Sequence, residues 1–399
     1  GGKYSGNVTI TDNTADGIKE RFVRMAGAGD AVVVIKDNLI NNYKGADEDY
    51  IKVTDGTNVT EENNFVGPIA DYDAFLEQIS DDTWYVDQSE LIIEDVADFA
   101  AFVEVVNNGN NFAGKTIKLA NDIDLYFKDV TAMADGDPVT FRPIGDTQYG
   151  QEPFKGTFDG QGHTIKNLYQ NGWDLGYQWG VYGSYGLFGS LDGATVKNVV
   201  IEGSESYIEG GDVSFIAGSA TGNCVFENIT INSGVAATYN NGCGGIIGWS
   251  GAGNYTFKNI KLDANTTIGG FQQSFDSSVG GIVGQTATST LVSSCAFEGV
   301  IEAGVEVGGI ASISSADDRF VNCHVVADIY GKGTIGGIIG SSDRSKVENC
   351  YIEGNIELVE AAKGGKVGGV IGAMGSTLSD SVYALVANNI VALDAMKLP

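Results

Sequence analysis

The stretch Gly245-Ile-Ile-Gly248 determines the architecture of this chain, because variants of it recur throughout the second half of the sequence. Each copy begins 28 to 36 residues after the copy before it. The copies are Gly186-Leu-Phe-Gly189, Phe215-Ile-Ala-Gly218, Gly245-Ile-Ile-Gly248, Gly281-Ile-Val-Gly284, Gly309-Ile-Ala-Ser312, Gly337-Ile-Ile-Gly340 and Gly369-Val-Ile-Gly372. A period of this length predicts a solenoid, in which each repeat buries its apolar face only against neighbouring repeats.

A second phrase, of the form apolar-x-polar-apolar-x-apolar, follows the first in each repeat. Examples are V-K-N-V-V-I ending at Ile201, F-E-N-I-T-I ending at Ile231 and V-E-N-C-Y-I ending at Ile352. Alternation over five or six positions predicts a half-buried strand. Two or three such strands in one repeat predict one coil of a parallel β-solenoid, with equivalent residues of neighbouring coils stacked about 4.8 Å apart.

The stacking predicts two columns of side chains along the solenoid. A polar column, in which turn amides bond the backbone and the amide of the next coil, comprises Asn198, Asn228, Asn259, Ser294, Asn322, Asn349 and Asp380. The inward column beside it comprises Val199, Ile229, Ile260, Cys295, Cys323, Cys350 and Ser381. Three of the five cysteines are therefore expected to be core thiols, and no C-x-x-C pair suggests a zinc site.

The segment before the repeats carries helical spacing. Apolar residues from Val96 to Val106 recur at intervals of three and four, with Asp95 as the N-cap and Gly109 just past the end. We expect a capping helix at about 95–107, because the first coil of a solenoid exposes unpaired backbone and apolar core.

These segments carry a family resemblance. L-I-I-E-D-V-A-D-F-A-A-F, G-K-T-I-K-L-A-N-D-I-D-L, R-P-I-G at 142–145 and F-D-G-Q-G-H-T-I-K-N-L precede the G-L-F-G and G-G-I-I-G coils. In this order they resemble bacterial surface and secreted proteins with GLUG repeats, over about residues 83–390. The resemblance implies an all-β, right-handed parallel β-helix displayed outside a bacterium, and it implies no particular activity.

The chain divides into three parts by pattern. Residues 1–82 lack the repeat and predict a small α+β domain, with an irregular extension as the alternative; Asp16 to Met25 and Asp71 to Ile79 have helical spacing. Residues 83–390 form the predicted β-helix. Residues 391–399 are predicted to be a C-terminal tail.

Composition limits the class of partner. The chain has 23 basic and 52 acidic side chains, a formal net charge of −29, which argues against nucleic acid and anionic membranes as partners. A hydrophobic fraction of 43% is too high for a disordered acidic polymer. No run of 18 apolar residues predicts membrane insertion, and we expect a monomer.

The aromatic segment 171–186 is the first candidate site. Its rings could stack on sugar or contact a protein, because each offers an apolar face and most a polar tip; the alternative is that they cover the side of the solenoid. The candidate ligand-binding residues are Trp173, Tyr177, Trp179, Tyr182 and Tyr185.

Asp122 and Asp124 form the second candidate, because carboxylates at i and i+2 on one strand face can bind Ca²⁺. The alternative is that they are ordinary turn aspartates. A structural calcium ion is the one cofactor that the sequence suggests.

The leading hypothesis is a non-catalytic, adhesin-like protein that binds a glycan or a cell-surface protein. His163 and His324 are both expected at structural or exposed positions, which leaves a Ser-His-Asp arrangement almost without candidates. Two alternatives remain: a carbohydrate-active enzyme with a groove along the β-helix, such as a polysaccharide lyase or hydrolase, and a structural stalk.

Overall fold

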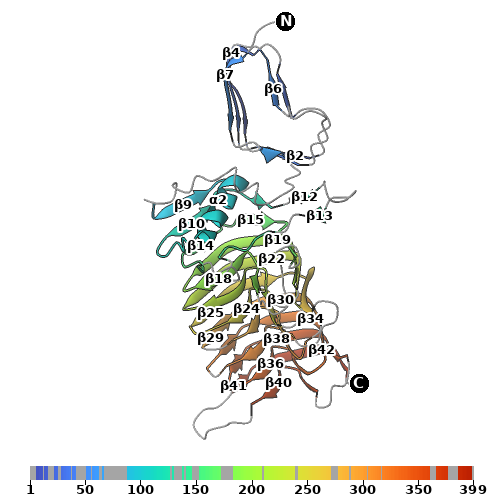
Figure 1. Ribbon diagram of the computed structural model, residues 1–399. Helices are drawn as coiled ribbons and strands as arrows, with labels where there is room; N and C mark the ends of the chain where they lie inside the picture. The colour runs from blue at the N-terminus through green and yellow to red at the C-terminus, as the bar shows by residue number, and fades with distance from the viewer. Residues whose placement is uncertain are drawn as a thin grey trace.

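The computed structural model (Figure 1) consists almost entirely of β-strands. It describes residues 6–11, 13–16, 22–25, 28–36, 38–41, 51–54, 56–62, 65–66, 88–125, 128–129, 137–138, 141–145, 152–171, 183–208, 211–238, 241–270, 277–286, 289–302, 304–315, 317–359, 365–375 and 385–397. Within them the repeats form a parallel β-helix, as the sequence predicts.

Three sheets run along the β-helix, and each repeat from residue 183 onward contributes to all of them. Sheet 1 has seven strands: β17 (Gly183–Tyr185), β20 (Gly211–Val213), β23 (Gly242–Gly244), β27 (Ser278–Gly280), β31 (Glu306–Gly308), β35 (Thr334–Gly336) and β39 (Lys366–Gly368). Sheet 2 also has seven: β18 (Phe188–Asp192), β21 (Ala217–Thr221), β24 (Ile247–Ser250), β28 (Val283–Gln285), β32 (Ala311–Ser314), β36 (Ile339–Ser342) and β40 (Ile371–Met374).

Sheet 3 contains the second phrase of each repeat and the upstream strands. Its upstream members are β9 (Glu90–Ile93), β10 (Thr116–Leu119), β11 (Ile123–Asp124), β14 (Thr157–Asp159), β15 (Thr164–Lys166) and β16 (Tyr169–Asn171). The repeats supply β19 (Thr195–Ile208), β22 (Cys224–Thr238), β25 (Tyr255–Leu262), β26 (Thr266–Gly270), β29 (Thr290–Ser293), β30 (Ala296–Glu302), β33 (Arg319–Val321), β34 (His324–Gly331), β37 (Lys346–Glu348), β38 (Tyr351–Leu358), β41 (Leu385–Ala387) and β42 (Ile390–Lys397). The strands β12 (Lys128–Asp129) and β13 (Asp137–Pro138) form a separate antiparallel pair.

The G-I-I-G phrase forms the corner between sheets 1 and 2. Its isoleucines point into the core, where Ile246 and Ile247 are fully buried. Its glycines let the backbones of the two sheets touch, because a Cβ on Gly248 would lie 2.6 Å from the backbone nitrogen of Val213. The predicted repeat therefore marks a position where a small residue, glycine in most copies, leaves room for a neighbouring backbone.

The predicted capping helix is α2 (Val96–Asn107), which covers the first coil. Asp95 accepts a hydrogen bond from the backbone of Asp98, 3.0 Å away, which satisfies a donor of the first turn. Phe99 and Phe102 are buried in the same core as the strands. At the helix end the buried side chain of Asn107 bonds both Pro143 O and Gly145 N, which fastens the R-P-I-G segment to the helix.

The α+β prediction for the first 82 residues is wrong in its helical part where it can be compared with the described residues. The ends of the predicted helix at 16–25 are strands, and the described strands of this region pair in parallel. They are β1 (Val8–Thr11), β2 (Thr14–Asp16), β3 (Val23–Met25), β4 (Gly29–Lys36), β5 (Leu39–Asn41), β6 (Ile51–Val53), β7 (Gly56–Glu62) and β8 (Phe65–Val66). They form the sheets β1-β4-β7, β2-β5-β8 and β3-β6, a short solenoid with its own core, so this region is not α+β in its described part. The predicted helix at 71–79 lies outside the described residues.

The predicted polar column lies at a bend of sheet 3. Asn228 donates a hydrogen bond to Asn198 over 2.9 Å and accepts one from Asn259 over 3.1 Å. Asn198, Asn228, Asn259, Ser294, Asn322 and Asn349 all have positive φ near 55°, a conformation that asparagine tolerates better than most residues.

The last member of that column needs correction. The pairing of Tyr351 with Ile390 places Asn388 beside Asn349 and Asn389 beside Cys350, and Asn388 has the positive φ of the column. Asp380 and Ser381 lie outside the described residues. The predicted tail at 391–399 is also wrong for residues 391–397, because β42 pairs with β38 as part of the last coil.

Replacing Asn228 with alanine is expected to lower the free energy of unfolding by about 1–2 kcal/mol, because alanine loses the amide bonds and strains the positive φ. Urea unfolding followed by circular dichroism measures the change. Asn228→Gly is the control, since glycine removes the bonds without the strain. A larger loss for Asn228→Gly than for Asn228→Ala would contradict this explanation.

Candidate functional site

The predicted aromatic site lies mostly outside the described residues. Trp173, Tyr177, Trp179 and Tyr182 belong to a segment that the structure does not describe. Tyr185 is described and is only 1% exposed, in the inward column of sheet 1 beside Val213. Its inclusion in a ligand-binding surface was therefore wrong, because the alternation of strand β17 turns its ring into the core.

The predicted calcium ligands bond protein groups of neighbouring strands. The Oδ1 of Asp122 accepts the backbone N–H of Thr164 over 2.9 Å and lies 3.4 Å from Nδ1 of His163. Asp124 accepts the side-chain amide of Asn167 over 2.7 Å. In the part of the chain that the structure describes, no group of three or more His, Cys, Asp and Glu side chains is arranged to hold a metal ion.

The outer face of sheet 3 carries ion pairs between neighbouring coils. Lys118 pairs with Glu90 at 2.8 Å, Lys197 with Asp159 at 3.2 Å and Lys258 with Glu227 at 2.6 Å. The Lys118–Glu90 and Lys258–Glu227 pairs lie at the surface and each contributes little to stability, about 0–1 kcal/mol, whereas Asp159 of the third pair is buried. Lys118, Lys197 and Lys258 are thereby engaged in contacts within the protein.

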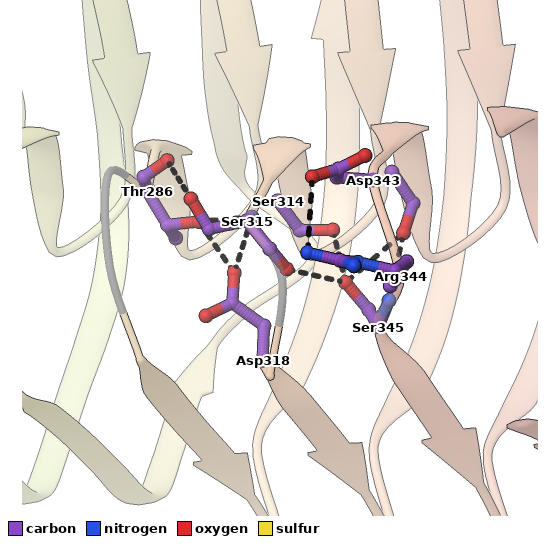
Figure 2. Close-up of polar contacts among 8 residues, drawn as sticks. Thr286, Ser314, Ser315, Asp318, Asp343, Arg344 and Ser345 are labelled. Atoms are coloured by element: carbon purple, nitrogen blue, oxygen red, sulfur yellow. Dashed lines mark hydrogen bonds and ion pairs between the residues drawn. The ribbon is translucent and has the colours of Figure 1, made fainter. Parts of the chain in front are cut away.

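The turns between sheets 2 and 3 enclose a polar network, shown in Figure 2. Asp318 is fully buried and accepts hydrogen bonds from the backbone of Thr290 at 2.8 Å, from the backbone of Ser315 at 2.7 Å and from the hydroxyl of Thr286 at 2.6 Å. In the next coil Ser345 occupies the position of Asp318 and its hydroxyl bonds Ser314. The network therefore joins three successive coils through buried hydroxyl and carboxyl groups.

The chemistry of this network is limited by its burial. Burial raises the pKa of Asp318 to about 7, although its bonds from Thr286, Ser315 and Thr290 oppose the shift. A hydroxyl beside a carboxyl of that pKa has the composition of a nucleophile and its base. Thr286 is only 4% exposed, however, so a substrate has no access to its hydroxyl. We assign the network to structure and not to catalysis.

The outward faces of sheets 1 and 2 carry a second polar arrangement, most of whose members keep contact with solvent. We call these two lines of side chains the corner rows. The row on sheet 1 comprises Ser184, Asp212, Gly242, Ser278, Glu306, Thr334 and Lys366. The row on sheet 2 comprises Ser190, Ser219, Trp249, Gln285, Ile313, Ser341 and Ala373. In these two described rows Lys366 is the only basic side chain.

The corner rows face one another across the glycine corner, with an offset of one coil. The hydroxyl of Ser184 donates to that of Ser219 over 3.0 Å, and Ser341 hydrogen-bonds the carboxyl of Glu306. The same offset places Trp249 opposite Asp212 and Gln285 opposite Gly242. Two close approaches agree with this placement: a Cβ on Gly248 would meet Val213 N at 2.6 Å, and one on Gly284 would meet Cys243 N at 2.8 Å.

Sequence reasoning missed Asp212 and Trp249. A usable signal was present, because Trp249 follows the last glycine of its phrase at a position held by serine, glutamine, isoleucine or alanine in other coils. A large aromatic residue at a position that turns away from the core is expected to be exposed, and Trp249 is 36% exposed. Nothing in the sequence distinguishes Asp212 from the other acidic residues.

Comparison with known proteins gives similarity over part of the chain. No family model matches. A stretch of 153 residues, 38% of this chain, is 33% identical to Halomucin of Haloquadratum walsbyi, and the match spans about 2% of the length of Halomucin.

Two solved structures are similar in overall shape. One, from Bacteroides ovatus and named for immunoglobulin A1 protease, has 18% sequence identity and a TM-score of 0.48, covering 77% of this chain and 83% of its own. The other, named IgA1 Protease, has 17% identity and a TM-score of 0.44, covering 77% of this chain and 20% of its own. In the described residues, no helix is long and apolar enough to cross a membrane.

Proposed function

We propose that this chain is a non-catalytic binding solenoid of a secreted or surface-displayed, adhesin-like protein, whose ligand is a glycan or a cell-surface protein. The observation that carries the proposal is the pair of corner rows. They run along the outside of the solenoid and present hydroxyls, carboxyls, an amide and an exposed indole. The resemblance of the repeats to GLUG-repeat surface proteins supports the proposed location.

The spacing of the carboxyl groups favours binding over hydrolysis. Glycosidases use two carboxyl groups about 5–10 Å apart. Asp212 and Glu306 are the two acidic residues of the corner rows, and burial raises the pKa of each. They lie on strands three coils apart, about 14 Å at the spacing of stacked strands. That separation is too long for a pair that acts on one glycosidic bond.

Binding without turnover tests the proposal. The full chain is applied to an array of glycans and cell-surface proteins, and bound glycans are recovered and analysed by mass spectrometry. We expect retention of at least one ligand with its mass unchanged. Release of unsaturated or reducing ends would overturn the proposal in favour of a carbohydrate-active enzyme. Retention of no ligand would overturn it in favour of a structural stalk.

A further inference from the structure

We propose that the last coil of the β-helix is an interaction surface for a second copy of this chain, and that two copies join tail to tail through it as a symmetric dimer. The last coil comprises β39, β40, β41 and β42 and lies at the opposite end of the β-helix from α2 (Figure 1). We call the side that it turns away from the preceding coil the end face. This inference goes beyond the proposed function and replaces the monomer that the sequence suggests.

The end face leaves core side chains uncovered. Three inward columns of sheet 3 continue into the last coil, from Val347 to Val386, from Ile352 to Val391 and from Ile356 to Met396. The members in the preceding coil are all fully buried, whereas the members in the last coil are 47%, 44% and 45% exposed, in that order. In sheets 1 and 2 the columns change from fully buried to partly buried residues: Ile335 to Val367, Ile338 to Val370 and Ile339 to Ile371. The core therefore continues to the end face and is open there.

The end face also presents an unpaired backbone edge. In the described residues the four strands of the last coil pair on one side only, with β35, β36, β37 and β38 of the preceding coil. The free N–H and C=O groups of such an edge are a template for pairing with another strand. β42 is the longest of the four, with eight residues, and it runs antiparallel to β42 of a second copy when a two-fold axis crosses it. An open core and an open edge on one face fit a partner with the same β-helix cross-section.

The other end of the β-helix is closed, which determines how two copies can meet. Leu91 and Ile93 are inward residues of the first coil and are only 1% and 0% exposed. The helix α2 contacts β9, and its Phe99 and Phe102 belong to the same core. A head-to-tail contact would have to seat the end face on this capped coil, which has no open core. The end face therefore meets another end face, and such a contact closes as a dimer without extending into a filament.

The charge of the last coil permits contact between copies. Its described residues, 365–375 and 385–397, contain two lysines and one aspartate, a net charge of +1, in a chain with a net charge of −29. Lys366 and Asp394 are both exposed, so each copy presents both signs of charge to the other. Like charge therefore does not oppose a contact at the end face.

The exposed apolar surface of the last coil approaches that of a stable interface. In the described residues twelve large apolar side chains are exposed, and six of them belong to this coil: Met374, Leu385, Val386, Ile390, Val391 and Met396. Together they expose on the order of 500 Å², near the upper end of the roughly 300–600 Å² of the largest patch on a monomer. With the partly buried core residues and the backbone edge, the surface comes close to the area of about 800 Å² per partner in a standard interface.

Sedimentation equilibrium of the full chain at micromolar concentration tests the proposal. We expect the wild type at twice the chain mass of 41.8 kDa. Val391→Asp is expected to raise the dissociation constant about tenfold or more, because uncompensated carboxylates would face one another in a buried contact. Leu291→Asp is the matched control, since Leu291 is 37% exposed on β29, outside the last coil, and this variant is expected to remain a dimer.

Hydrogen exchange of the wild type locates the contact without a substitution. We expect the backbone amides of β42 to exchange more slowly as the protein concentration rises, and those of β29 to be unchanged. A chain that stays monomeric throughout the micromolar range would overturn the proposal. A dimer that Val391→Asp leaves intact and that gives β42 no added protection would overturn the end face as its contact. Growth into larger oligomers would overturn the closed tail-to-tail arrangement.

Discussion

Asp318→Ala is expected to lower the free energy of unfolding by about 3–5 kcal/mol, the cost of leaving buried donors without an acceptor. The backbone N–H groups of Thr290 and Ser315 and the hydroxyl of Thr286 all donate to this carboxyl group. The methyl group of alanine accepts none of these bonds and leaves a cavity besides. Chemical denaturation at pH 7 measures the loss.

The pH dependence of the Asp318→Asn variant separates charge from hydrogen bonding. Burial raises the pKa of Asp318 to about 7 in the folded protein, from an ordinary 3.8, so the folded state binds the proton more tightly than the unfolded state. The stabilising contribution of this group is complete below about pH 4 and is lost as the pH rises through 7. Wild-type stability is thus expected to fall, relative to Asp318→Asn, by up to about 4 kcal/mol between pH 4 and pH 8. A difference that does not change with pH would contradict the assignment.

Gly308→Val is expected to destabilise the solenoid by about 3 kcal/mol through overpacking at the corner of sheets 1 and 2. A Cβ at this position would lie 2.7 Å from the nitrogen of Gly340, 2.8 Å from the oxygen of Ile338 and closer still to the oxygen of Ala311. These are backbone atoms, and they are held by the hydrogen bonds of two coils. The two sheets would have to separate locally to admit the side chain.

Two controls accompany the Gly308 variant in urea unfolding. Gly6→Val places the same side chain where a Cβ meets nothing within 4 Å, and its effect is expected to stay within about 0.5 kcal/mol. Gly308→Ser is expected to lower the free energy of unfolding less than Gly308→Val does. The reason is that Ser214 occupies the equivalent position of its coil, where its hydroxyl donates to the oxygen of Ile246 over 3.0 Å. Equal stability of Gly308→Val and the wild type would show that the two sheets can separate at this corner without cost, and would contradict the overpacking argument.

The coil architecture could be predicted because several independent properties repeat together. The glycines needed at the corner, the isoleucines beside them and the asparagines of the polar column keep a nearly constant period. The prediction failed in the last coil because its loops differ in length. Counting along the chain placed Asp380 in the polar column, whereas strand pairing places Asn388 there. Register is fixed by hydrogen bonds between coils, which spacing reproduces only when loop lengths are constant.

The first region shows where periodicity is ambiguous. Ile18, Phe22 and Met25 have helical spacing, yet Val23–Met25 is a three-residue strand in a parallel sheet. A strand of three residues carries too little alternation to be told from one face of a helix. The candidate site was missed for a related reason: the exposure of Trp249 and the partial burial of Asp212 depend on how two sheets meet, which no local pattern encodes.

The in-register stacking of the coils also bears on how such a chain can change in length. Each coil presents the same inward columns and the same backbone edge to the coil on either side. A gene duplication or deletion that adds or removes one entire coil therefore leaves every remaining column continuous, whereas a change of a few residues within a strand shifts one coil against all others. Variation among related chains is expected in units of whole coils and in loop length, and each such event would move a surface feature along the solenoid axis by one spacing of about 4.8 Å.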